Sequence, residues 1–304
     1  MTKAAMAGVV LVLMTCASAQ SSLKRPKITG IDHVSFYTTD QDKNQKLYVT
    51  VLGLQKAASP VEPGQVQRFI IGKQWVGYIP VGDTQSTDRM DHVALTVENC
   101  EAMRSYLASK GVAVPTAASS SRYGFKSFEV KDPEGNRIEF VERTSAFERP
   151  PVEGAPVSRR MIHAGFTVRD RAAEDHFYKD LLGFRPYWSG GMRPERTDWV
   201  AIQVPDGTDW LEYMLNIKSD ADQHTKGVMN HISLGVKDMN AAQSELESHG
   251  WQASANEHSQ IGKDGKLQLN VYDPDQTRIE LMEFKPVDKP CCSQFTGPHP
   301  SEDQ

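Results

Sequence analysis

The sequence has few cysteines and no excess of basic residues. Its 304 residues include four cysteines, and one of them, Cys16, lies in an apolar N-terminal stretch. Cys291 and Cys292 are adjacent and Cys100 begins a helix-like segment, so the three do not follow the spacing of a disulfide-rich scaffold. Lys and Arg number 34 against 39 Asp and Glu, which leaves no basic surplus to neutralise phosphates. We therefore expect no nucleic-acid partner, and we expect Cys100 to be a packed thiol.

Long hydrophobic runs are missing beyond the N-terminus. No later segment approaches the roughly 18 apolar residues that a membrane span needs, so no transmembrane segment is predicted. The chain begins with the charged MTK, continues with AAMAGVVLVLM, and reaches the small-residue site ASA before Gln20. This pattern predicts a signal peptide over residues 1–19 and an exported protein, periplasmic or secreted. A lipoprotein signal ending at Cys16 is less favoured, because Thr15 fits that pattern poorly.

What the chain does have is a fourfold internal repeat. Four segments begin alike: GIDHVSFYT at 30, MDHVALTV at 90, MIHAGFTV at 161 and NHISLGVKD at 230. Each indicates a short strand with a histidine near its start. Each is followed by a stretch of helical periodicity that ends in glycine, and then by short apolar runs between Gly, Pro and Asp turns. The unit is strand, helix and about three strands. The sequence therefore predicts an α+β fold built from four βαβββ modules.

A Pro-rich, charged segment without periodicity separates the second module from the third. It divides the chain into two domains of two modules each. The predicted boundaries are 29–144 for domain 1, 145–158 for the linker, 159–286 for domain 2 and 287–304 for a flexible tail. A metal site in that tail, formed by Cys291, Cys292 and His299, is a minor alternative.

One motif occurs twice, as DPEGNRIEFVE at 132–142 and DPDQTRIELME at 273–283. Each copy is an Asp-Pro turn followed by an apolar strand that contains a glutamate, Glu139 or Glu280. A carboxylate in a buried strand is unfavourable unless something compensates its charge. Together with the strand histidines and the helix end FYKDLLGF, these motifs resemble the vicinal oxygen chelate superfamily. That superfamily includes glyoxalase I, extradiol dioxygenases and fosfomycin- and bleomycin-resistance proteins.

The resemblance implies that the strands curl into open cups whose first and last strands offer metal ligands. Carried onto this sequence, it gives a principal set in domain 2: His163, Glu212, His231 and Glu280. A second, weaker set lies in domain 1: His33, His92 and Glu139. The second set is smaller because Gly77 falls where Glu212 would be. Imidazoles and carboxylates suit one divalent ion, with Zn, Fe(II), Mn, Ni and Co all compatible. Such a cation would also compensate the buried glutamates.

The grouping of these residues depends on how the modules pair. Pairing of module one with two and of three with four gives the sets above, and the linker favours it. Some relatives with four modules instead pair one with four and two with three. The groups would then be His92, Glu139, His163 and Glu212 in one cup, and His33, His231 and Glu280 in the other.

The implied chemistry is chelation of a small substrate through neighbouring oxygen atoms. Lyase or isomerase chemistry like that of glyoxalase I is favoured, with Glu212 or Glu280 as the catalytic base. An exported protein would not meet cytosolic glutathione, so lactoylglutathione itself is not expected as the substrate. An extradiol-type dioxygenase is an alternative, although GKDGKLQLNVYDP lacks the histidine expected before the Asp-Pro turn.

A metal-free binding or resistance protein is a third possibility, although such relatives usually lack the His/Glu set. The chain is expected to be a monomer or a homodimer. Six aromatic residues near the strands could wall a cup or belong to the core: Trp75, Tyr78, Trp188, Trp199, Trp210 and Tyr213.

Overall fold

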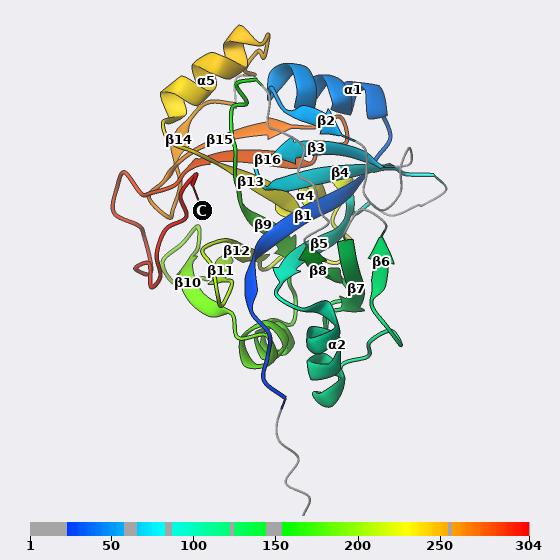
Figure 1. Cartoon of the computed structure of the whole chain (residues 1–304). Coiled ribbons are helices and arrows are strands. Elements are labelled where there is room, and N and C mark those ends of the chain that lie inside the picture. Colours follow the sequence, from blue (N-terminus) through cyan, green and yellow to red (C-terminus); the bar gives the residue numbers. More distant parts are fainter. Residues whose placement is uncertain are drawn as a thin grey trace, which may run out of the picture.

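The computed structural model describes residues 23–57, 66–82, 87–121, 125–143, 154–254 and 257–303. The predicted signal peptide lies outside the described residues, and so does most of the predicted linker. No helix in these described ranges has both the length and the apolar character needed to cross a membrane. The four predicted βαβββ modules are present and form two eight-stranded sheets (Figure 1).

Domain 1 contains modules one and two in a single sheet with the strand order β2-β3-β4-β1-β5-β8-β7-β6. Module one consists of β1 (Ile28–Thr38), α1 (Gln41–Gln45), the π-helical turn η1 (Lys46–Val51), β2 (Gln55–Ala57), β3 (Gln67–Ile71) and β4 (Gln74–Pro80). Module two consists of β5 (Met90–Val97), α2 (Cys100–Ser109), β6 (Ser119–Ser121), β7 (Phe125–Lys131) and β8 (Arg137–Arg143).

Domain 2 repeats this order as β10-β11-β12-β9-β13-β16-β15-β14. Module three consists of β9 (Met161–Thr167), α3 (Arg171–Asp175), the π-helical turn η2 (His176–Leu181), β10 (Arg185–Gly190), β11 (Trp199–Gln203) and β12 (Trp210–Met214). Module four consists of β13 (His231–Val236), α5 (Met239–Ser248), β14 (Gln260–Ile261), β15 (Leu267–Tyr272) and β16 (Arg278–Glu283). The helix α4 (Gln223–Met229), which precedes β13, was not predicted.

The sheet order decides between the two predicted pairings. In each domain the first strands of the two modules lie next to each other and run antiparallel, β1 beside β5 and β9 beside β13. Modules one and two therefore share one cup, and modules three and four share the other. The ligand groups predicted for the alternative pairing do not form.

The ends of the helices follow from local sequence. The helix after the first strand of every module starts at an Asp or Asn whose side chain accepts the backbone N–H three residues later, which satisfies one of the unpaired groups at a helix start. These caps are Asp40, Asn99, Asp170 and Asp238. In modules one and three the helical segment stops at Gly53 and Gly183, whose φ values of 67° and 79° belong to the left-handed region that favours glycine.

The convex faces of the two sheets and their helices share one hydrophobic core. Figure 1 shows α1 and α5 side by side, and the His249 ring nitrogen Nδ1 after α5 lies 3.0 Å from the carbonyl oxygen of Val51. The repeated Asp-Pro turns take part in this interface. Asp132 accepts a hydrogen bond from Tyr178 at 3.1 Å, and Asp273 accepts one from Tyr78 at 2.9 Å. Each turn thus joins its own domain to the other.

The C-terminal tail lies along β10. The sequence predicts only a flexible segment for this part of the chain. The backbone N–H of Thr296 donates to the carbonyl of Tyr187 at 3.0 Å, and the Tyr187 hydroxyl lies 2.6 Å from Nδ1 of His299. Cys291 and Cys292 are joined to each other in a disulfide. The minor alternative of a tail metal site is therefore wrong, because both thiols are bonded and His299 has its partner in Tyr187. Cys100 is a buried free thiol, as predicted.

Candidate metal centres

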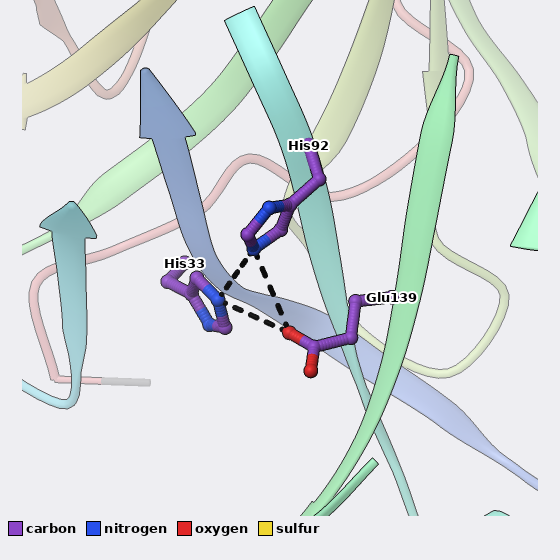
Figure 2. A group of neighbouring side chains, drawn as sticks. All are labelled: His33, His92 and Glu139. Atoms are coloured by element: carbon purple, nitrogen blue, oxygen red, sulfur yellow. Dashed lines mark hydrogen bonds and ion pairs between the residues drawn. The ribbon is translucent and has the colours of Figure 1, made fainter. Parts of the chain in front are cut away.

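Both cups bring two histidines and a glutamate together at equivalent positions. In domain 1 these are His33, His92 and Glu139 (Figure 2). The Nε2 atoms of His33 and His92 lie 2.9 Å apart, and Oε2 of Glu139 lies 3.2 Å from the first and 3.7 Å from the second. All three side chains point at one spot on the floor of the cup.

In domain 2 the corresponding group is His163, His231 and Glu280. The two Nε2 atoms lie 3.1 Å apart, and Oε2 of Glu280 lies 3.3 Å from Nε2 of His163. Oε2 of Glu212 lies 3.8 Å from Nε2 of His163 and 3.6 Å from Nε2 of His231. The four residues of the principal predicted set therefore do converge.

Strand register explains the convergence. His33 on β1 pairs with Ala94 on β5, and Ala94 pairs with Glu139 on β8, so the imidazole and the carboxylate face each other across a small side chain. His92 lies two residues before Ala94 and therefore on the same face of the sheet. In domain 2, Ser233 takes the place of Ala94 between His163 and Glu280.

The fourth position differs between the domains. Glu212 pairs with Gly165 on β9, and the matching pair in domain 1 is Gly77 with Ser35 on β1. Gly77 therefore occupies the position of Glu212, as predicted. A Cβ atom at Gly77 would lie 2.7 Å from the Ser35 hydroxyl oxygen, so a larger residue would not fit without displacing its neighbours.

Two β-bulges add carboxylates to the domain 1 site. The register between β1 and β5 shifts at Asp32 and again at Asp91, the residues immediately before His33 and His92. In a regular strand neighbouring side chains point to opposite faces, whereas a bulge inserts an unpaired residue and re-aims its side chain. Asp32 Oδ1 lies 2.9 Å from Nδ1 of His33, and Asp91 Oδ2 lies 2.7 Å from Nδ1 of His92.

These aspartates are themselves held in place. Arg143 donates to Asp32 at 2.6 Å, while Arg137 and the Tyr37 hydroxyl both donate to Asp91 at 2.5 Å. A carboxylate at Nδ1 fixes the proton on that nitrogen and leaves the lone pair of Nε2 directed into the cup. Both histidines of domain 1 therefore present an electron pair to the same point.

The charges of domain 1 stabilise one another. Burial raises the pKa of Asp32, but the charge of Arg143 and the contact with His33 outweigh it and bring that pKa to about 2. Burial lowers the pKa of His33, but hydrogen bonds to Asp32 and Glu139 outweigh this, so the net change is upward. The pKa of Glu139 is lowered, because contact with His33 exceeds the opposing effect of burial. A positive charge between these groups is thus favoured.

Domain 2 lacks these supporting carboxylates. Its bulge residue is Ile162, so Nδ1 of His163 is buried without a hydrogen-bond partner among the described residues. Nδ1 of His231 lies 2.8 Å from the carbonyl oxygen of Met229, and Asn230 stands where domain 1 has Asp91. The guanidinium of Arg278 lies 2.7 Å from Nε2 of His231, the nitrogen that would bind a metal.

The pKa shifts of histidine and glutamate side chains in domain 2 have the opposite direction to those in domain 1. Burial and the positive charges of Arg278 and Lys266 lower the pKa of His163 well below its usual range. Burial and the negative charge of Glu280 raise the pKa of Glu212 to about 8. Burial also lowers the pKa of Lys266 to about 8. Arg278 and Lys266 offset only part of the effect of burial on the carboxylates, because burial outweighs their charges and the pKa values of Glu212 and Glu280 both stay raised.

A cavity of about 600 Å³ opens above the domain 2 site. Glu212, Glu280 and Arg278 are among the residues that line it. Its aromatic wall is formed by Tyr187, Trp188, Trp199, Trp210 and Phe295. The predicted wall residues Trp188, Trp199 and Trp210 are therefore in the cup of domain 2. Trp75 stacks on His33 in domain 1 at 3.7 Å, whereas Tyr78 and Tyr213 belong to the core on the convex faces.

A metal ion fits the residues of domain 1 on chemical grounds. Two imidazole nitrogens with their electron pairs directed inward and one carboxylate oxygen lie within 4.8 Å of one another. Such a set is unfavourable without a shared proton or a cation, and two His with one carboxylate form a three-ligand site that leaves coordination positions open. Asp32 and Asp91 were not predicted, although among the four histidines of the first strands only His33 and His92 directly follow an aspartate, which offers a signal.

Comparison with protein-family models gives a match to the family described as "Glyoxalase/Bleomycin resistance protein/Dioxygenase superfamily" over residues 30–140 and 160–281. The two matched ranges coincide with the two cups and together cover most of the chain. A comparison with curated protein sequences gives no significant match.

Solved structures with a similar fold include two kinds of enzyme. The Mn(II)-bound glyoxalase from Novosphingobium aromaticivorans has a TM-score of 0.65 and 16% identity, over 85% of this chain and 83% of that one. The 2,3-dioxygenase LapB from Pseudomonas sp. KL28 has a TM-score of 0.63 and 12% identity, over 92% and 96%. A variant of homoprotocatechuate 2,3-dioxygenase from B. fuscum, in complex with HPCA, has a TM-score of 0.63 and 16% identity, over 86% and 72%. At these identities the likeness is one of fold.

Proposed function

Because this chain belongs to the glyoxalase/bleomycin resistance protein/dioxygenase superfamily, we propose that it is a metal-dependent enzyme acting on a small molecule with two adjacent oxygen atoms. We place its tighter metal site in domain 1, at His33, His92 and Glu139. The observation that carries this proposal is the pair of carboxylates, Asp32 and Asp91, on the far nitrogens of both histidines.

This choice reverses the order predicted from the sequence, where the domain 2 set came first. Domain 2 has one more carboxylate, Glu212, but its His231 already accepts a hydrogen bond from Arg278. A metal ion there would have to displace a guanidinium and would lie near a second buried cation, Lys266. In domain 1 the arginine at the equivalent position, Arg137, is bound to Asp91 and Glu129 instead.

The residues of domain 1 have definable roles in this proposal. Asp32 and Asp91 keep the protons on Nδ1, so that each imidazole remains a neutral ligand through Nε2. Trp75 stacks on His33 and limits its rotation. Glu139 supplies the anionic ligand. A divalent ion held by these three groups would act as a Lewis acid towards the oxygen atoms of a chelating substrate. Gly77 stands where domain 2 has Glu212, so domain 1 offers three ligands and no fourth one at this position.

The two candidate reactions make different demands on the chain. Glyoxalase-type proton transfer needs a carboxylate base beside the metal, and Glu212 could serve as that base only if the ion is bound in domain 2. Dioxygenase-type chemistry needs two histidines, one carboxylate and open positions, which favours domain 1. Loss of turnover in Glu212→Gln together with loss of the ion in His231→Ala would favour the first reaction, whereas turnover that survives Glu212→Gln but fails in His92→Ala would favour the second.

The proposal is tested by metal analysis of the purified mature protein and four single variants, His33→Ala, His92→Ala, His163→Ala and His231→Ala. We expect about one ion per chain in the wild type, and loss of most of it when either domain 1 histidine is removed. The two domain 2 variants are matched controls that should retain the ion. Loss of metal only in the domain 2 variants would move the centre there. A wild type without any divalent ion would leave the metal-free binding protein as the better description.

We also propose that the protein is exported and starts near Gln20. Support comes from the N-terminal pattern and from the disulfide between Cys291 and Cys292, since structural disulfides persist mainly in oxidising compartments. Mass spectrometry of the protein from its native cells should find an N-terminus after Ala19. An intact Met1 or a lipid on Cys16 would contradict this.

A further inference from the structure

The arginine after the Asp-Pro turn has different surroundings in the two domains. Arg137 and Arg278 occupy equivalent positions at the start of the last strands, β8 and β16. Arg137 is drawn out of the cup by two carboxylates, Asp91 at 2.5 Å and Glu129 at 2.7 Å. Register identifies their counterparts in domain 2 as asparagines: Asn230 precedes His231, and Asn270 pairs with Glu280 as Glu129 pairs with Glu139.

Without those carboxylates, Arg278 reaches into the domain 2 cup. One terminal nitrogen lies 2.7 Å from Nε2 of His231. The other is 3.5 Å from Oε1 of Glu280, longer than a good charge-assisted hydrogen bond. The Nε atom is buried and has no hydrogen-bond partner among the described residues. Of the guanidinium nitrogens, only the one bonded to His231 has a short hydrogen bond, so the pairing capacity of Arg278 is not saturated.

A second cation lies beside this cup. Lys266 is fully buried, and its amine has no hydrogen-bond partner among the described residues. It lies 4.5 Å from the ring centre of Trp210 and 5.4 Å from that of Phe295, two rings that wall the cavity. At the equivalent position domain 1 has Phe125, so this buried charge belongs to domain 2 alone. A buried, unpartnered amine is unfavourable unless a ligand or neighbouring charges compensate it.

We propose that the domain 2 cup binds a small organic carboxylate, whose anionic group pairs with the guanidinium of Arg278, which lines the cavity. Lys266 adds positive charge behind the aromatic wall, and the apolar part of the ligand lies against Trp199 and Trp210. A cavity of about 600 Å³ is within the range that holds a ligand of one or two rings. This binding site is separate from the domain 1 metal centre and does not depend on it.

Matched probes test the proposal: 4-hydroxybenzoate, and 4-hydroxybenzamide as the neutral molecule of the same shape. Both are titrated calorimetrically into the mature protein as isolated, with its metal content recorded. We expect the carboxylate to bind about 10-fold more tightly than the amide, as a charge-assisted hydrogen bond would give. In Arg278→Gln this preference should disappear while the affinity for the amide stays. Arg278→Lys should keep part of the preference, and Lys266→Met should reduce it several-fold.

The control is Arg137→Gln, the same change at the equivalent position of domain 1, which should leave the preference intact. Equal affinities of the wild type for the two probes would overturn the proposal, and so would a preference that survives Arg278→Gln. These outcomes are independent of the metal analysis. A failed carboxylate preference beside an intact domain 1 metal contradicts only the anion site, and the reverse result contradicts only the metal centre.

Discussion

The two domains carry the same three ligand-type side chains on equivalent strands, but the groups around those side chains differ in charge. Domain 1 surrounds its histidines with Asp32 and Asp91, whereas domain 2 has Ile162 and Asn230 at the same places. Domain 2 has Lys266 where domain 1 has Phe125, and its Arg278 points into the cup. A ligand set alone therefore does not define a site. The neighbours decide whether the same cup attracts a cation or an anion.

The difference also answers why a buried glutamate is present in both copies of the Asp-Pro motif. Glu139 lies against two histidines whose far sides are bound to aspartates, so a metal ion would complete its compensation. Glu280 lies near Arg278 and Lys266, whose charges offset part of the effect of burial, and its pKa stays raised. The Asp-Pro part of the motif has another role, because Asp132 and Asp273 each accept a tyrosine hydroxyl from the other domain.

The largest expected effect comes from giving domain 1 the neighbours of domain 2. In the double variant Asp91→Asn, Glu129→Asn, His92 loses its carboxylate and Arg137 loses both of its anchors. The guanidinium is then free to donate to Nε2 of His92, as Arg278 does to His231. We expect the metal affinity to fall about 100-fold. Competition with a chelator measures it, and an affinity within twofold of the wild type would show that these neighbours do not matter.

The reverse exchange gives domain 2 two of the carboxylates that surround the domain 1 site. In Asn230→Asp, Asn270→Glu, the new carboxylates should draw Arg278 away from Nε2 of His231. The experiment is made in a His92→Ala background, so that the domain 1 site does not contribute. We expect metal affinity in domain 2 to rise about 10-fold and the preference for a carboxylate probe to fall. The effect is smaller than in the first exchange because Ile162 and Lys266 remain. Unchanged metal affinity with Arg278 still in the cup would contradict the assigned role of the asparagines.

Much of the fold and both ligand groups could be predicted from the sequence. The fourfold repeat gives the modules. Each first strand has a histidine at the same place, so a small error in the predicted strand boundaries does not change the predicted ligands. The module pairing could not be decided, because it depends on β1 lying beside β5 and not on any local pattern.

The rest depended on geometry that strand periodicity does not contain. Asp32 and Asp91 join the domain 1 site only because bulges turn two consecutive side chains to one face, and regular alternation predicts the opposite. The direction of Arg278 is attributed to Asn230 and Asn270, which lie on two different neighbouring segments, and no local pattern around Arg278 contains this information. The packing of the tail on Tyr187 depends on a contact across more than a hundred residues.

The smallest expected effect concerns a further difference between the domains, inside their first helices. Glu174 in α3 is buried at the position that Asn44 occupies in α1, and Asn44 donates to the Thr38 hydroxyl at 2.6 Å. One oxygen of Glu174 accepts the backbone N–H of Glu134 at 2.9 Å, while the other has no hydrogen-bond partner among the described residues. Burial, and then the negative charge of Asp132, raise the pKa of Glu174 from 4.5 to about 8.

The sign of the effect follows from that shift. Between pH 4.5 and about 8 the folded protein holds a proton on Glu174 that the unfolded chain releases, so this group favours folding at low pH and less so as pH rises. Glu174→Gln removes the ionisation and keeps an oxygen for the N–H of Glu134. We expect the variant to match the wild type near pH 4.5 and to be more stable by about 1–2 kcal/mol above pH 8. Urea denaturation across this range, with Asn44→Gln as the matched change in α1, measures the difference. A constant difference at all pH values would mean that Glu174 ionises in the folded protein as it does in the unfolded chain.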